Sequence, residues 1–313
     1  MGNILQCDLI SLKEALEISS KSASDGSRKI MSGIDSLDSM TNGWLPGELC
    51  VFGARPAMGK TGFVLSCIAS IVSDKMPVAL FSSTDCLNER FMFRLTTALK
   101  THDSDMREIP LYLCMSHNLN LSYIKHNLSK LIKEKNVRCV FIETIQSVFV
   151  SEENGNTKEG MERICHELKG LAMEFGIPII ITSELNRSTE YREGYFGKQP
   201  RLCDLRSSSA IEQEADTVYL FWRPYYYGIS IDEQGNDLRE IGELIIAKNS
   251  NGLLGSLRVK FNNSTGLIEQ LPDNHEKTSN NSLQQCDDVD MDKYDSNDAF
   301  HDLVDIFGLD ITQ

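Results

Sequence analysis

Short apolar runs alternate with amphipathic stretches from Ile30 to about Leu271. The apolar runs predict buried strands, and the stretches with apolar residues at helical spacing predict helices. Strands are expected at residues 49–53, 77–82, 111–115, 138–143, 177–183, 217–222, 242–247 and 256–261. Helices are expected at residues 60–74, 86–100, 121–135 and 158–175. This alternation predicts an α/β fold, with a mostly parallel twisted sheet covered by helices on both faces.

The last two expected strands follow one another closely, around Asn251 and Gly252. An Asn-Gly dipeptide is typical of hairpin turns, although the loop here is longer than two residues. We therefore expect an antiparallel hairpin at the C-terminal end of the sheet.

The two ends of the chain differ from this central region. Residues 9–19 have the spacing of a short amphipathic helix, and residues 20–28 are a Ser-rich linker. After Pro272 the sequence turns to Asn, Ser, Asp and Gln, so we expect disorder there. Residues 300–307 could still form an acidic amphipathic helix on a protein partner, or could be a chance cluster. The expected domains are 1–28, 29–272 and 273–313.

Composition narrows the class of protein. No apolar run approaches the roughly 20 residues that span a membrane, and the N-terminus lacks the pattern of a signal peptide. The nine Cys include no C-x-x-C pair, which favours reduced thiols in a cytoplasmic protein. The net charge is −14, but residues 273–313 carry eleven Asp or Glu and two Lys. The rest of the chain is only mildly acidic and could carry a local basic patch.

A phosphate-binding loop stands between the first expected strand and the first helix. Residues 54–61 read Ala-Arg-Pro-Ala-Met-Gly-Lys-Thr, close to the pattern G-x-x-x-x-G-K-[ST] with Ala54 in place of the first Gly. The backbone N–H groups of Ala57, Met58 and Gly59 would face the phosphates of ATP at the positive end of the helix dipole. Lys60 can reach the β- and γ-phosphates, and the Thr61 hydroxyl can bind Mg²⁺. The alternative is an ordinary strand–helix turn.

Glu143 ends the apolar run 139–142 and is a candidate Mg²⁺ ligand, because a carboxylate at the end of a buried strand needs a partner. The alternative is that Glu143 emerges into solvent. Asp85 is the carboxylate that follows the strand at 77–82, where a water-activating base is expected. Alternatively, Asp85 is the N-cap of the next helix, with Glu89 in its first turn.

The region from Gly33 to Phe261 resembles the C-terminal ATPase domain of DnaB-type replicative helicases, which has a RecA-like P-loop NTPase fold. The DnaB form of the phosphate loop also lacks the first Gly. The other matching segments are residues 33–38, Gly43, Leu45, 47–48, Gln146, 186–188, 203–206, 211–216, Lys248 and 251–252. The region from Gly33 to Phe261 that carries them is about three quarters of the chain.

This resemblance implies an ATP-dependent, Mg²⁺-dependent DNA helicase that acts on single-stranded DNA in replication, as a homo-oligomer such as a hexameric ring. It implies that Arg94 and Gln146 contact the phosphate region. Lys248 would act on the site of a neighbouring subunit. The DNA-facing loop would contain Arg206, Ser207 and Ser209, the last in place of a family Gly. The acidic loop at residues 151–156 would face the channel, where it weakens DNA binding; the alternative is that this loop points elsewhere.

Several reacting groups depart from the family pattern. Glu143 replaces an Asp, Glu184 replaces the polar γ-phosphate sensor, and Ser250 replaces the arginine finger. The water-activating Glu becomes Thr84 when counted from Pro77, or Asp85 when counted back from Arg94, and we prefer Asp85. Loss of an arginine finger can cost roughly 10³–10⁵ in turnover. We therefore expect weak ATP hydrolysis.

Two other functions remain open. The chain could be an ATP-binding partner that regulates a replication or recombination complex without unwinding DNA, or a RecA-like recombination mediator, whose motifs fit less well. About 30 residues precede the core, too few for the helical N-terminal domain of the family, so we expect that domain to be absent. The helix at 9–19 resembles the family's linker helix, which packs on the neighbouring subunit.

Overall fold

The structure is a computed structural model that describes residues 29–271, except 84, 85, 87, 101–107, 118, 151–156 and 207. Several sequence predictions lie outside the described residues: the helix at 9–19, the acidic loop at 151–156, the tail at 273–313, Thr84, Asp85 and Ser207.

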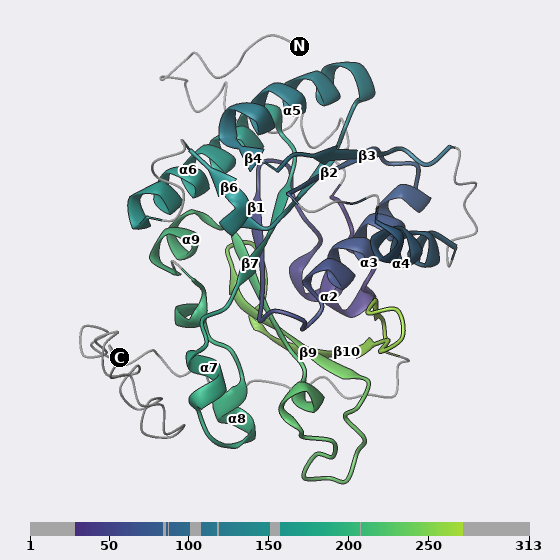
Figure 1. Ribbon diagram of the computed structural model, residues 1–313, viewed down its shortest axis with the longest axis vertical. Coiled ribbons are helices and arrows are strands. Elements are labelled where there is room, and N and C mark those ends of the chain that lie inside the picture. The colour runs from purple at the N-terminus through teal and green to yellow at the C-terminus, as the bar shows by residue number, and fades with distance from the viewer. Residues whose placement is uncertain are drawn as a thin grey trace, which may run out of the picture. The chain divides into compact units, whose positions relative to one another are not determined.

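A nine-stranded sheet forms the centre of the molecule, with the strand order β11-β10-β9-β8-β1-β7-β5-β2-β3 (Figure 1). Six strands are parallel: β1 (Leu49–Ala54), β2 (Val78–Ser82), β3 (Leu111–Met115), β5 (Cys139–Glu143), β7 (Ile179–Glu184) and β8 (Thr217–Trp222). Three are antiparallel: β9 (Ile241–Asn249), β10 (Gly255–Phe261) and β11 (Ile268–Glu269). The short strands β4 (Leu119–Asn120) and β6 (Val148–Phe149) pair separately.

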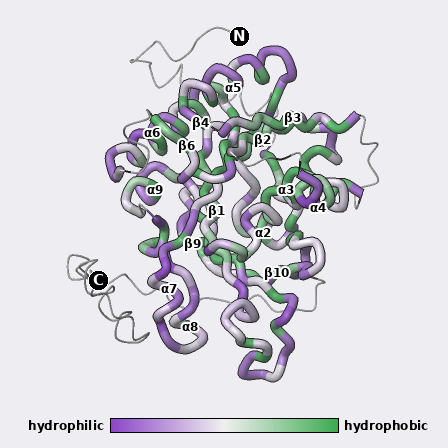
Figure 2. The backbone as a smooth tube through the Cα atoms, in the orientation of Figure 1, coloured by the Kyte–Doolittle hydropathy of each residue, from purple (hydrophilic) through white to green (hydrophobic). Residues whose placement is uncertain are grey.

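Helices cover both faces of the sheet (Figure 1). The helices α2 (Asp35–Thr41), α3 (Lys60–Ser73) and α4 (Glu89–Lys100) lie on one face, and α5 (Leu121–Lys135), α6 (Lys158–Phe175) and α9 (Ser208–Glu214) lie on the other. The remaining elements are short: η2 (Ile145–Ser147), α7 (Ser188–Tyr191), α8 (Gly194–Lys198), η3 (Leu202–Asp204) and η4 (Pro224–Tyr227). Figure 2 shows the apolar positions concentrated on the strands and on the inner sides of the helices.

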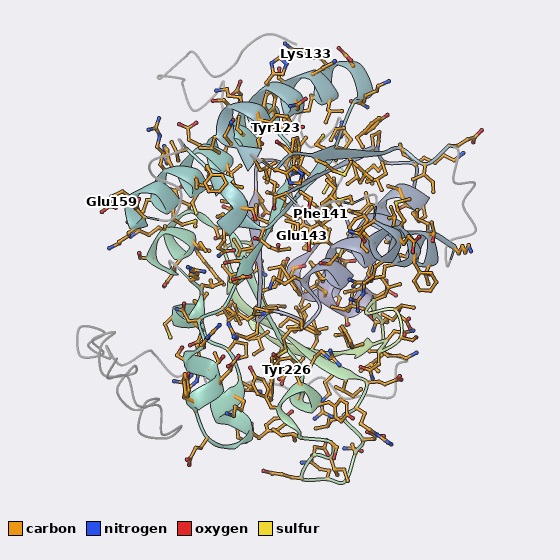
Figure 3. The ribbon with its side chains drawn as sticks, viewed as in Figure 1. Tyr123, Lys133, Phe141, Glu143, Glu159 and Tyr226 are labelled. Carbon is orange, nitrogen blue, oxygen red and sulfur yellow. The ribbon has the colours of Figure 1, made fainter. Side chains whose placement is uncertain are left out.

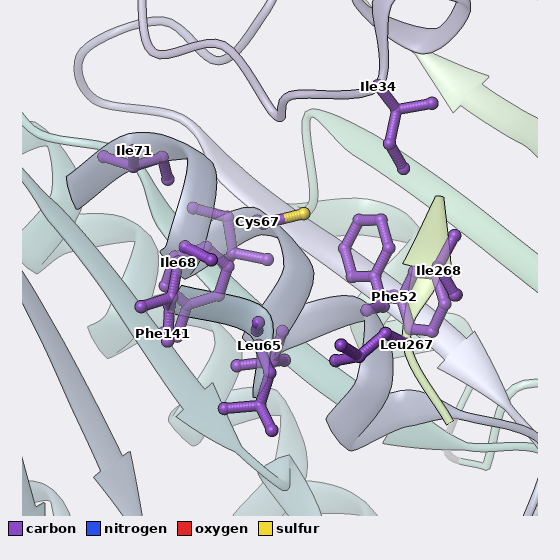
Figure 4. Packing of buried hydrophobic residues seen from close by; sticks show 14 of the residues in the cluster. Ile34, Phe52, Leu65, Cys67, Ile68, Ile71, Phe141, Leu267 and Ile268 are labelled. Atoms are coloured by element: carbon purple, nitrogen blue, oxygen red, sulfur yellow. The ribbon is translucent and has the colours of Figure 1, made fainter. Parts of the chain in front are cut away.

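The sheet separates two apolar clusters, because successive side chains of a strand point to opposite faces. In β1, Cys50 and Phe52 belong to the cluster under α3, whereas Leu49 and Val51 belong to the cluster under α6. Figure 4 shows the α3 side, where helix, strand and C-terminal residues meet. Phe52 stacks on Phe63 there, with ring centroids 3.9 Å apart. Burying each such side chain contributes about 1.5–3 kcal/mol.

The α/β architecture, the eight strands of the main alternation, the four long helices and the C-terminal antiparallel hairpin are confirmed. The largest difference in a boundary is at the helix expected at 86–100, which begins at Glu89. The Asn88 side chain accepts a hydrogen bond from the Phe91 N–H at 2.9 Å and so caps that helix. The interpretation of Asp85 as its N-cap is therefore wrong.

No disulfide joins the cysteines that the structure describes, and all of these except Cys114 and Cys203 are buried. Burial raises the pKa of the Cys114 thiol to about 11 and that of the Cys165 thiol to about 12. None of the helices in the described part of the chain has the length and apolarity to cross a bilayer.

Candidate nucleotide-binding site

The carboxyl ends of the parallel strands meet at one edge of the sheet, and most of the predicted nucleotide-site residues lie there. The last residue of β1, Ala54, pairs with Glu184 of β7. The last residue of β2, Ser82, pairs with Glu143 of β5. Figure 3 shows Glu143 near the middle of the molecule, on the strand that also carries Phe141. The strand order therefore brings the phosphate loop and two carboxylates together.

The phosphate loop has the backbone that its sequence requires. Ala57 and Gly59 have positive φ angles, 62° and 121°. A side chain at Gly59 would stand 2.7 Å from the Phe261 ring, so only glycine fits there. Helix α3 then begins at Lys60, with the Phe63 N–H donating to the Gly59 carbonyl at 2.9 Å. The loop therefore presents a helix N-terminus, which suits an anion.

Thr61 and Glu143 are in direct contact, because the Thr61 hydroxyl donates a hydrogen bond to Glu143 Oε1. Glu143 is only 9% exposed, so the alternative that it emerges into solvent is wrong. Burial raises the pKa of Glu143, and the Thr61 hydrogen bond and the charges of Arg94 and Lys60 partly oppose that rise. A hydroxyl and a carboxylate are both oxygen donors of the kind that Mg²⁺ prefers, so this pair fits the ion.

Two cations lie beside Glu143. Lys60 Nζ donates to the Ala54 carbonyl at 3.2 Å. Burial lowers the pKa of Lys60, while the charges of Glu184 and Glu143 act in the opposite direction. Arg94, on α4, donates to the carbonyls of residues 265 and 266 at 2.8 and 3.1 Å. Burial also lowers the pKa of Arg94, and the Glu143 charge opposes this.

Gln146 and Glu184 connect the nucleotide edge to the predicted DNA-facing segment. Gln146 donates to Ser183 Oγ at 3.0 Å and accepts from the Glu184 N–H at 3.2 Å. The Glu184 carbonyl accepts from the Arg206 N–H at 3.1 Å, and the two side chains approach to 3.9 Å. Arg206 and Ser209 are both exposed, as a nucleic-acid contact requires.

Lys248 lies away from the phosphate loop of its own chain. It pairs with Val218 near the start of β8, and its Nζ donates to the Glu212 carbonyl at 2.6 Å. Because β9 runs antiparallel to β8, the chain moves away from the loop edge as it approaches Lys248. The Ser250 N–H and hydroxyl both contact the Asp216 carbonyl at 3.0 Å. One chain therefore does not bring Lys248 together with Lys60.

Sequence reasoning missed an arginine–aromatic stack beside the loop. The Arg223 guanidinium lies over the Phe261 ring, 3.5 Å from its centroid, and donates to Asn263 Oδ1 at 2.7 Å. Phe261 in turn faces Gly59. Both side chains are buried, so the stack forms part of the packing beside Gly59. The aromatic residue at the end of the strand expected at 256–261 was the available signal.

Comparison with known proteins places these features in a family. A family model described as "DnaB-like helicase C terminal domain" matches residues 29–101 and 84–270. The "Probable replicative DNA helicase" of Trieres chinensis is 32% identical over 270 residues, which cover 79% of this chain and 58% of that protein. The "Replicative DNA helicase DnaB" of Mycoplasma genitalium is 33% identical over 261 residues, which cover 75% and 55%. The chain thus spans about half the length of these relatives.

Solved structures agree on the fold. One described as an "ATPase Domain" matches with a TM-score of 0.69 at 24% identity, over 85% of this chain and 100% of that one. "The Structure Of A DnaB-Like Replicative Helicase And Its Interactions With Primase" matches with a TM-score of 0.68 at 24% identity, over 85% and 68%. The fold is therefore that of a RecA-like ATPase domain. With the family model matching most of residues 29–270, this chain belongs to the family of DnaB-like helicase C-terminal domains.

Proposed function

We propose that this protein is an ATP-dependent motor of the DNA helicase type, which hydrolyses ATP slowly and acts on single-stranded DNA during replication. The observation that carries the proposal is the position of Lys60 and Thr61 against buried Glu143, at the sheet edge where Glu184 also meets Arg206. This arrangement supports the proposal because the phosphate loop and the proposed nucleic-acid contact at Arg206 lie on adjacent segments.

Nucleotide binding uses groups that the chain holds in place. The N–H groups of residues 57–59 and the start of α3 face the phosphates, and Lys60 neutralises their charge. Thr61 and Glu143 would hold Mg²⁺, which neutralises charge on the phosphates when it is bound.

Hydrolysis needs groups from two subunits. Asp85 takes the proton of the attacking water, and Lys248 of a neighbouring subunit stabilises the developing charge, since it lies away from the loop of its own chain. The subunits therefore form a homo-oligomer. Ser250 provides no guanidinium and Glu184 is a carboxylate near the phosphate region, so we expect turnover roughly 10³–10⁵ below that of a site with an arginine finger.

Arg206 and Ser209 contact the phosphate backbone of the DNA, together with Ser207. Backbone contacts of this kind are electrostatic and carry no base specificity, so binding should weaken steeply with salt.

The test is single-turnover ATP hydrolysis with and without single-stranded DNA. We expect a low basal rate that rises many-fold with DNA, and Asp85→Ala should abolish it. The matched control is Asp237→Asn, which removes an exposed ion pair with Arg239 and should change neither rate. Native mass should show an oligomer in the presence of nucleotide. A chain that stays monomeric in every nucleotide state would exclude a two-subunit site.

The carboxylate of Glu184 near Lys60 favours a second candidate. The protein would bind ATP without turnover and regulate a replication or recombination complex, with residues 300–307 as the segment that meets a protein partner. Tight ATP binding with no hydrolysis, unchanged by DNA, would support this candidate and eliminate the motor.

A further inference from the structure

Residues 186–204 leave the edge of the sheet and return to it, and this segment is called the 186–204 lobe. Its two ends are joined, because Leu185 and Leu205 form an antiparallel bridge and the Asn186 N–H donates to the Asp204 carbonyl at 2.7 Å. The lobe contains α7 and α8, which lie side by side (Figure 1), and η3. It begins directly after β7 and ends directly before the Arg206 segment.

One side chain of the phosphate loop, Arg55, forms hydrogen bonds with the start of this lobe. Arg55 Nε and Nη2 both donate to Glu190 Oε1, at 2.8 and 2.5 Å, and Nη1 donates to the Leu185 carbonyl at 2.8 Å. The Arg55 side chain is only 11% exposed. Charge-assisted hydrogen bonds of a guanidinium with this little exposure are strong and directional. Arg55 therefore fixes the lobe relative to the loop that binds phosphate.

A second ion pair fixes the end of the lobe. Arg192, two residues after Glu190, donates to Asp204 Oδ2 at 2.7 Å and to the Gln199 carbonyl at 3.1 Å. Asp204 is buried and also accepts from the Arg201 N–H at 2.7 Å. Two ion pairs, Arg55–Glu190 and Arg192–Asp204, therefore lie between the phosphate loop and Arg206, and the short chain segments 190–192 and 204–206 join them.

A narrow crevice lies between part of the loop and the lobe. It is lined by Met58 of the loop, Thr189 and Lys198 of the lobe, and Tyr227, and it has no room for a water molecule. The lobe therefore packs closely against the loop at this point, and the Arg55–Glu190 ion pair adds a directional contact to that packing.

We propose that the Arg55–Glu190 pair, continued by Arg192–Asp204, positions Arg206 according to the nucleotide held in the loop, so that DNA affinity depends on nucleotide through these side chains. This rests on the proposed function, in which Arg206 contacts single-stranded DNA. Glu190 and Arg192 are positioning residues that touch neither ATP nor DNA. Coupling of this kind is reciprocal and is measured as a ratio of affinities.

The experiment measures binding of a fluorescent oligo-thymidylate to the full chain, with ADP and with a non-hydrolysable ATP analogue. In the wild type we expect the two DNA affinities to differ by about fivefold or more. In Glu190→Gln, which removes the charge and keeps the shape, the ratio should fall to within about twofold of one, while affinity for the ATP analogue is unchanged. Asp237→Asn should keep the wild-type ratio.

A second variant tests whether the two ion pairs change the ratio of DNA affinities together, in one series, or independently of each other. Arg192→Gln should lower the ratio as Glu190→Gln does, and the double variant should lower it no further, because both residues act in one series. A wild-type ratio retained in Glu190→Gln overturns the proposal and leaves the proposed function standing. If both single variants lose nucleotide binding, the ion pairs have a structural role alone. That result also overturns the proposal. A wild type that binds no DNA in either nucleotide state refutes the proposed function itself.

Discussion

Gly62 and Gly170 offer the same substitution with opposite expected results. Both glycines lie inside helices, in α3 and α6, where Ala is favoured over Gly by about 1 kcal/mol. A methyl group at Gly62 would stand 1.8 Å from the Gly266 carbonyl oxygen, whereas a methyl group at Gly170 meets nothing within 4 Å. Packing, and not helix propensity, therefore decides whether Gly62→Ala stabilises or destabilises the protein.

The magnitude follows from the shift that the Gly62 methyl requires. To restore an ordinary contact of 3.4 Å, the Gly266 carbonyl must retreat by about 1.6 Å. That carbonyl belongs to a turn held by Arg94, and Gly266 has a φ of +70°. Overpacking usually costs about 1–3 kcal/mol, and a displacement as large as this takes the upper part of that range, about 2–3 kcal/mol. After the propensity gain, we expect Gly62→Ala to lose about 1–2 kcal/mol.

Thermal unfolding measures both variants. With about 2–4 °C per kcal/mol for a domain of this size, Gly62→Ala should lower Tm by roughly 2–8 °C. Gly170→Ala should raise Tm by roughly 1–4 °C, from a gain of about 0.5–1 kcal/mol. An unchanged or higher Tm in Gly62→Ala would refute the reasoning from the Gly266 contact. A lower Tm in Gly170→Ala would refute the propensity argument used for both.

Two further predictions concern buried polar groups. Trp44 Nε1 donates to the Tyr219 hydroxyl at 3.1 Å and both side chains are fully buried, so Tyr219→Phe should lower the free energy of unfolding in urea by about 1–3 kcal/mol. A loss no larger than that of an exposed Tyr→Phe change would contradict this. Burial raises the pKa of Glu48 above its usual 4.5, so the folded state holds this proton more tightly and stability is lost as pH rises through that raised pKa. Glu48→Gln should therefore gain in Tm relative to the wild type as pH rises from the usual 4.5 through the raised pKa, and a constant difference would disprove it.

The sequence predicts the long elements because their signals are local. Helix α6 has Thr157 as its N-cap, with the side chain accepting from the Gly160 N–H, and ends at Gly176 in the left-handed conformation. Helices α7 and α8 have four and five residues, too few to show a period of 3.6. Helix α2 is tied to Gln270, which lies 234 residues from Ser36 along the chain. Contacts of that separation have no local signature.

The same difference between local signals and long-range contacts explains which residues of the site can be predicted from the sequence. Lys60 and Thr61 are predicted from one motif, and Glu143 from the end of one apolar run. Arg223 and Phe261 meet only because β8 and β10 flank β9 in the sheet. The sequence of neither segment predicts this order of strands. Arg55 was visible within the loop, but its partner lies 135 residues away.

The exposure of Cys203 allows a dye to be attached to the 186–204 lobe. Alkylating dyes react with thiolates, and the buried thiols keep their protons, with raised pKa values at Cys50, Cys67, Cys139 and Cys165. Among the cysteines in the described residues, Cys203 alone is exposed, and it belongs to η3 at the end of the lobe. Once Cys7 and Cys286 are replaced by Ser, a maleimide dye should attach at Cys203, beside the Asp204 anchor. Its emission would follow the lobe in real time as nucleotide binds, with no engineered cysteine.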